Sequence, residues 1–248
     1  MSDWNDPRTT QSPFGSSGAS LNGASMGAVT MDQGLRKYML SIYNYMASGV
    51  LLSGVVALLF ATSGFAAQVM VTPLRWVIAL SPLAFVMAMS FGLHRMQEST
   101  LKLLFWLFSV AMGLSLSSIF LIYTGPSIAT TFFATAGAFA GLSLYGYTTK
   151  RNLSGMGSFM AMGVIGLIIA MLLNLWLQSG PLAMAISGLG VLIFAGLTAW
   201  DTQRLRETYY HVAGTDMMGK VVIMGALSLY LDFVNMFQFL LSFLGNRD

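Results

Sequence analysis

The sequence predicts an all-α polytopic membrane protein whose seven transmembrane helices form one bundle. Of its 248 residues, 56% are hydrophobic and 8% are charged, whereas a soluble globular domain carries about 25% charged residues. The apolar residues are gathered into seven runs, each close to the length of about 20 residues that crosses a bilayer as a helix. Charged and turn-forming residues stand mainly between these runs. The pattern excludes a soluble domain with a single membrane anchor.

The seven runs follow one another closely. They are Tyr38–Thr62, Trp76–Leu93, Leu103–Tyr123, Ser127–Thr148, Met156–Leu177, Leu182–Trp200 and Val221–Phe243. The breaks contain residues that interrupt helices, namely Pro73, the Thr124-Gly125-Pro126 corner, the basic turn Lys150-Arg151-Asn152, and Ser179-Gly180-Pro181. We expect one long loop, at about Thr202–Gly219, before the last span.

Residues 1–34 differ in composition from the rest of the chain. They are rich in Ser, Gly and Asn, contain Pro7 and Pro13, and have too little apolar content to fold alone. No basic segment followed by a short apolar core and a cleavage site precedes the first full-length span, so a signal peptide is not predicted. We predict a disordered cytoplasmic tail over residues 1–34 and a single seven-helix domain over residues 35–248.

The basic residues predict the orientation in the membrane, since Lys and Arg are enriched in cytoplasmic loops. One side receives ten of the 12 Lys and Arg residues, and the other receives only Arg75 and Arg247. The ten are Arg8, Arg36, Lys37, Arg95, Lys102, Lys150, Arg151, Arg204, Arg206 and Lys220. This count predicts a cytoplasmic amino terminus and a carboxy terminus on the periplasmic or extracellular side.

Composition also limits the chemistry. The chain has no cysteine, which removes disulfides, thiolate metal sites and a Cys nucleophile. No cofactor is predicted, and a net charge of +3 is too small to indicate nucleic-acid binding. The 19 methionines are interpreted as adaptable apolar filling. Several glycines inside the spans, among them the small-xxx-small pair Gly137 and Gly141, are predicted to allow close helix packing.

The last span contains a carboxylate, Asp232, near its middle. At about 100° per residue, small and polar residues share one side of this helix and apolar residues the other. The polar stripe contains Gly225, Ser228, Asp232, Asn235 and Ser242, and the opposite side contains Tyr230, Val234, Phe237 and Leu241. An ionisable residue inside a span costs about 3 kcal/mol or more and usually faces a bundle interior or a wet cavity. Asp232 is therefore a candidate functional residue, or else a structural carboxylate held by Ser or Asn donors.

Asp201 lies at the end of the sixth run, on the predicted cytoplasmic side. One interpretation is a local ion pair with Arg204 or Arg206 at a helix end. The other is a pair with Asp232, because the two carboxylates flank the connection between consecutive antiparallel helices. Asp232 lies about 17 Å along its helix from Val221. Contact therefore requires that Asp201 be drawn inward or that the seventh helix begin in the cytosol.

If the two carboxylates meet, they form a pair that shares a proton and responds to pH. The protonated pair can hydrogen-bond two helices shut over a narrow path. The doubly ionised pair repels itself and attracts an oxygen-seeking cation such as Ca²⁺. Arg95, at the cytoplasmic end of the second span, can act as a third member by pairing with Asp201. Alternatively, Arg95 only sets the topology, beside His94.

Three sequence segments resemble the Bax inhibitor-1 (transmembrane Bax inhibitor motif) family of seven-helix membrane proteins, in particular its bacterial branch. They are Trp200-Asp201-Thr202-Gln203, the stretch Leu229-Tyr230-Leu231-Asp232-Phe233-Val234-Asn235-Met236-Phe237, and Leu144-Tyr145-Gly146-Tyr147 before the basic turn. The resemblance implies six helices around a central seventh, and an aspartate pair that acts as pH sensor for a Ca²⁺ leak in the bacterial inner membrane. Carried onto this chain, the sensor is Asp201 and Asp232, with Arg95 engaging the first, and both aspartates transiently contact Ca²⁺.

Two other functions compete with the pH-sensitive Ca²⁺ leak. The first is a non-conducting stress regulator, since bacterial relatives are associated with modulating a membrane-bound ATP-dependent (AAA) protease, and the tail offers such a machine a handle. The second is an intramembrane aspartyl protease. The sequence disfavours it because Asp232 lies in Tyr230-Leu231-Asp232 and not in a Gly-x-Gly-Asp context. We therefore expect a protein that is not an enzyme. Its expected partners are the bilayer, Ca²⁺ and H⁺, with a membrane-bound AAA protease under the regulator alternative, and nucleic acid is not among them.

Overall fold

The computed structural model describes the backbone of residues 17–246, and the side chains of residues 32–246 apart from Met70. The chain divides into two compact units between Lys37 and Tyr38, and the packing described below is that of the second unit. No β-strand occurs in the described part of the chain. The disordered tail predicted over residues 1–34 stays a prediction. Residues 1–16 lie outside the described residues, and the backbone of residues 17–34 forms the beginning of the first helix.

Nine helices occur between residues 17 and 246. They are α1 (Ser17–Thr62), α2 (Phe65–Met70), α3 (Leu74–Gly92), α4 (Glu98–Leu116), α5 (Ile119–Ile122), α6 (Gly125–Thr148), α7 (Ser154–Leu177), α8 (Gly180–Val212) and α9 (Met217–Leu244). Seven stretches are long and apolar enough to cross a membrane, with α4 and the one-turn α5 forming one of them. The predicted seven-span, all-α architecture is confirmed.

Two of the predicted breaks are helix starts with the expected chemistry. Thr124 precedes α6, and its hydroxyl oxygen accepts a hydrogen bond from the Ser127 backbone N–H at 3.4 Å. Ser179 caps α8 in the same way through the Leu182 N–H, also at 3.4 Å. Each cap satisfies a donor that the first turn leaves unpaired.

The predicted long loop at Thr202–Gly219 is wrong. Helix α8 continues without a break to Val212, and the connection to α9 is a turn of residues 213–216. Gly214 occupies the turn with a φ of 76°, a left-handed conformation that favours glycine. The apolar run ends at Trp200 because charged residues follow, but buried side chains continue with helical spacing at Leu205 and Tyr209. The helix therefore continues beyond the end of the apolar run.

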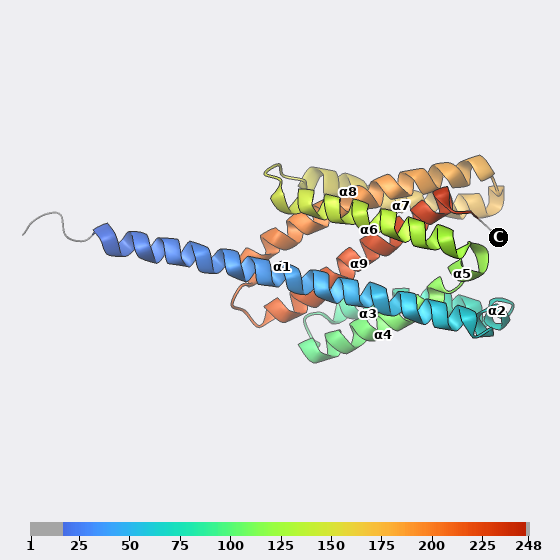
Figure 1. Ribbon diagram of the computed structural model, residues 1–248, viewed down its shortest axis with the longest axis horizontal. Coiled ribbons are helices and arrows are strands. Elements are labelled where there is room, and N and C mark those ends of the chain that lie inside the picture. Colours follow the sequence, from blue (N-terminus) through green and yellow to red (C-terminus); the bar gives the residue numbers. More distant parts are fainter. Residues whose placement is uncertain (1–16, 247–248) are drawn as a thin grey trace, which may run out of the picture. The chain divides into compact units, whose positions relative to one another are not determined.

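Helix α9 is the central helix of the bundle. In its most apolar stretch 56% of residues are buried, compared with 39% for α8 and 11% for α3 and α7. It packs against α8, α6 and α4, and Figure 1 shows it running between α6 and α8 on one side and α4 on the other. Aromatic rings contact it from two sides, with Phe139 against Phe233 and Phe108 against Tyr230. Most side chains in the middle of α9, including Asp232, are therefore enclosed by the rest of the bundle.

The glycine pair Gly137 and Gly141 does not pack against another helix, contrary to the prediction. A Cβ atom built on either glycine meets no atom within 4 Å. The close contact of α6 is made instead by Gly146, where a Cβ would overlap the carbonyl oxygen of Ala199 on α8. Another glycine inside a span, Gly190 of α8, does pack closely, since its Cβ would lie 2.5 Å from the Phe239 ring of α9.

Candidate functional site

The two aspartates predicted from the sequence lie on facing helices, Asp201 on α8 and Asp232 on α9. Both helices extend beyond the aspartates toward the connecting turn, by about 16 Å from Asp201 to Val212 and about 22 Å from Met217 to Asp232. The two residues therefore differ in depth by about one helical turn. The extension of α8 to Val212 therefore reduces the depth difference implied by the apolar runs alone, about 17 Å, to about one helical turn.

The predicted polar stripe of α9 faces α8. Ser228 donates a hydrogen bond to Asp201 Oδ2, and Ser242 accepts one from Ser187 at 3.0 Å. A Cβ on Gly225 would lie 2.7 Å from the Leu205 side chain. Small and hydroxyl side chains therefore line the interface between the two helices on either side of Asp232.

Asp201 is held by an arginine one turn along its own helix. Arg204 Nη2 lies 3.1 Å from Asp201 Oδ1 and 3.5 Å from the Ser228 hydroxyl oxygen. The guanidinium group also lies over the Trp200 ring, 4.7 Å from its centroid. Asp201 itself is only 5% exposed, whereas the Arg204 side chain is 48% exposed. Arg204 therefore carries positive charge from the surface of the bundle to a buried carboxylate.

Asp232 is equally buried but less well partnered. It is 5% exposed, and its Oδ2 atom has no hydrogen-bond partner among the described residues. The charged groups that act electrostatically on it are Asp201 and Arg204. Asn235, on the same stripe, donates to the Leu231 carbonyl oxygen at 2.8 Å and so is engaged with its own helix. One arginine therefore serves two buried carboxyl groups.

The third predicted member of the site, Arg95, is placed differently. It lies exposed in the turn between α3 and α4. In the described part of the chain, the ion pair of Asp201 is with Arg204 and not with Arg95. Arg204 has the advantage of a fixed position at i+3 on the same helix. A role for Arg95 stays a prediction.

The carboxyl pair offers few ligands for a metal ion. Among the described residues no group of three or more His, Cys, Asp or Glu side chains could hold a metal ion. Ca²⁺ takes six to eight oxygen ligands, and two carboxyl groups with nearby hydroxyls supply fewer. The arrangement instead suits a proton shared between two carboxyl groups, with transient attraction of a cation when both are ionised.

Sequence comparisons show what kind of membrane protein contains this pair. The family described as "Inhibitor of apoptosis-promoting Bax1" matches residues 35–248. The chain belongs to the Bax inhibitor-1 family. Similar proteins include an uncharacterised protein of Rickettsia prowazekii, 49% identical over 220 residues that cover 88% of this chain and 93% of the other. The inner membrane protein YbhL of Escherichia coli K12 is 44% identical over 218 residues, covering 86% and 93%. With its seven spans, this Bax inhibitor-1 family member is a multi-pass inner-membrane protein.

The conspicuous Trp-Asp-Thr-Gln segment of this family member has structural tasks besides Asp201. Gln203 is buried, accepts from the Leu153 N–H and donates to the Arg151 carbonyl oxygen, each at 2.8 Å. It therefore anchors the α6–α7 connection to α8. Next to it, the Trp200 ring occupies the space that a side chain at Gly157 would need. These contacts fix the α8 backbone on both sides of the aspartate.

A second buried polar cluster was missed by the sequence reasoning, which placed Tyr230 on an apolar face. The Tyr230 hydroxyl lies 2.6 Å from the Ser53 hydroxyl of α1. Ser53 donates to carbonyl oxygens, including that of Ser109 on α4 at 2.7 Å. Because carbonyls only accept, Tyr230 is the donor to Ser53. The signal available from the sequence was a hydroxyl in mid-span on each helix.

The Tyr230–Ser53 bond is expected to couple α9 to α1 measurably. In a double-mutant cycle of Tyr230→Phe and Ser53→Ala, we expect a coupling energy of about 1 kcal/mol, typical of hydrogen bonds between membrane helices. Thermal unfolding of the purified variants in detergent measures it. Additive losses in the double variant would contradict the bond.

Proposed function

We propose that this protein is a pH-sensitive Ca²⁺-permeable leak channel gated by Asp201 and Asp232. The observation that carries the proposal is the charge balance of the buried pair, in which two carboxyl groups share the single guanidinium of Arg204. The site is electrically balanced when the pair holds one proton. Loss of that proton leaves a net negative charge inside the bundle, which is costly unless helices separate or a cation enters.

The gate follows from the position of the pair between α8 and α9. With a proton present, the carboxyl groups can hydrogen-bond across the interface and hold the central helix against α8. Without it, they repel one another and a divalent cation is attracted to the polar stripe. We therefore expect Ca²⁺ flux to rise as pH rises through the titration of the pair.

The proposal is tested with the full-length protein in liposomes that contain a Ca²⁺-sensitive dye. Over a pH series, we expect flux above that of protein-free liposomes, increasing with pH. Absence of flux at every pH would reject the channel. It would favour the non-conducting regulator of a membrane-bound ATP-dependent protease, for which dependence of the cellular phenotype on residues 1–34 is the corresponding test.

The orientation is part of the same proposal. The asymmetry of Lys and Arg supports a cytoplasmic amino terminus, which places the α8–α9 turn and the exposed side of Arg204 toward the cytoplasm. The proton that operates the latch then equilibrates with cytoplasmic pH. Labelling of single cysteines introduced at Ser154 and Gln178, in intact cells, distinguishes the two orientations.

A matched pair of substitutions distinguishes the role of Arg204 from that of Arg95. In Arg204→Gln the pair loses its buried counter-charge, so the shared proton is held to higher pH and the pH of half-maximal flux is expected to move upward. In Arg95→Gln, which removes an exposed charge outside this contact, we expect little change. Flux across the pH series measures both. A shift in Arg95→Gln alone would transfer the role to Arg95.

A further inference from the structure

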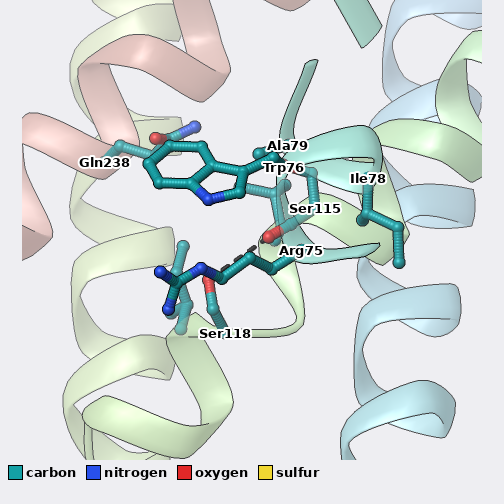
Figure 2. Close-up of a pocket in the computed structure, with 9 residues that line it drawn as sticks. Arg75, Trp76, Ile78, Ala79, Ser115, Ser118 and Gln238 are labelled. Carbon is teal, nitrogen blue, oxygen red and sulfur yellow. Dashed lines mark hydrogen bonds between the residues drawn. The ribbon is translucent and has the colours of Figure 1, made fainter. Parts of the chain in front are cut away.

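A pocket of about 280 Å³ lies between α3, the α4–α5 break and α9. It is separate from the aspartate pair, since Gln238, its α9 residue, lies about 9 Å beyond Asp232 along the helix and on another side of it. Figure 2 shows the guanidinium of Arg75 and the indole of Trp76 extending into this space. The pocket therefore has its own chemistry.

The polar lining of the pocket is cationic and rich in hydrogen-bonding groups. Arg75 is the one charged residue among the described residues that line it, beside Ser115, Ser118 and Gln238. Ser118 donates to the Ser115 carbonyl oxygen at 3.2 Å, a long bond for a hydroxyl donor. Such a bond is readily exchanged for an anionic acceptor. A guanidinium fork with adjacent hydroxyls matches the oxygens of a phosphate group.

The remaining lining and the position indicate a lipid. Ile78, Ala79, Leu116 and Ile119 form an apolar part of the pocket wall. Arg75 is the second residue of the span Leu74–Gly92, and Trp76 is 61% exposed, so both lie where spans meet the headgroup region. The Arg75 guanidinium is 5.2 Å from the Trp76 ring centroid, which orients the two side chains together.

We propose that this pocket binds the phosphate of an anionic phospholipid headgroup. Arg75 pairs with the phosphate, Ser118 and Gln238 donate hydrogen bonds to the headgroup, and the acyl chains leave along the apolar wall. A zwitterionic headgroup is disfavoured because its own cation would stand near Arg75 without a carboxylate in the pocket lining. Lipid binding at this pocket does not require that the protein conduct Ca²⁺.

The test uses the purified full-length protein in detergent, with dioctanoyl-phosphatidylglycerol as the probe. We expect this lipid to raise the melting temperature and to remain bound in native mass spectrometry, and dioctanoyl-phosphatidylcholine to do neither. Arg75→Gln should lose both effects. Arg151→Gln, which removes an exposed charge from the α6–α7 connection, should keep them.

A second substitution and two other ligands test the pocket independently of Arg75→Gln. Ala79→Leu retains Arg75 but fills the pocket, so it should also weaken retention of phosphatidylglycerol. This variant keeps the site testable even if Arg75→Gln does not fold. Equal retention in wild type, Arg75→Gln and Ala79→Leu would overturn the site. An equal stabilisation by inorganic phosphate would overturn the lipid assignment in favour of a free anion, and equal retention of phosphatidylcholine would overturn the charge selectivity.

Discussion

Replacing Asp232 by asparagine is expected to hold the proposed channel shut at every pH. The amide cannot ionise, yet it can still donate a hydrogen bond toward Asp201, so it mimics the protonated member of the pair. A single shared proton changes the ratio of closed to open protein by up to about tenfold per pH unit. We therefore expect flux in Asp232→Asn to be low and to lose that dependence on pH.

The matched control for this substitution is Asp216→Asn. Asp216 precedes α9 in the exposed turn, and asparagine is an equally good residue before a helix. It removes the same charge outside the buried pair, so the pH response should be retained. A pH response that survives in Asp232→Asn would be incompatible with the proposed gate.

The second large effect is expected at Gly146, where α6 crosses α8. A Cβ there would overlap the Ala199 carbonyl oxygen and lie 2.9 Å from its carbonyl carbon. These are backbone atoms, which no rotamer change can move, so Gly146→Ala must separate the helices two residues from Asp201. We expect a loss of about 1–3 kcal/mol in the free energy of unfolding, measured by unfolding in detergent.

Gly141→Ala is the control on the same helix. It removes a glycine with nothing within 4 Å of its Cβ position and gains helix propensity. A neutral or slightly stabilising effect is expected. If Gly146→Ala were equally harmless, the close crossing of α6 and α8 would be wrong.

The spans were predictable from the sequence because burial in lipid demands an apolar run of fixed length, and hydropathy reports that demand directly. The end of α8 was not predictable from hydropathy, because a helix can continue into water through charged residues that end the apolar run. The same extension decides whether Asp201 reaches Asp232, so the geometry of the pair needed the structure.

Partner choice was the other limit. A stripe such as Ser228 and Ser242 indicates a polar side of α9, but not that this side meets α8. Gly137 and Gly141 have the small-xxx-small spacing of a packing motif but meet no other helix. Gly146, which has no small residue four positions away, makes the close contact with α8. Arg204 was available from its i+3 spacing to Asp201. Its contact with Ser228 on the neighbouring helix depends on tertiary packing and was not.

The central claim is that Asp201 and Asp232 act as one proton-sharing unit. The most direct test compares Ca²⁺ flux across a pH series for wild type, Asp201→Asn, Asp232→Asn and the double variant in liposomes. A coupled pair predicts that each single variant loses the pH response and that the double variant adds nothing further. Two independent effects that combine in the double variant would contradict it.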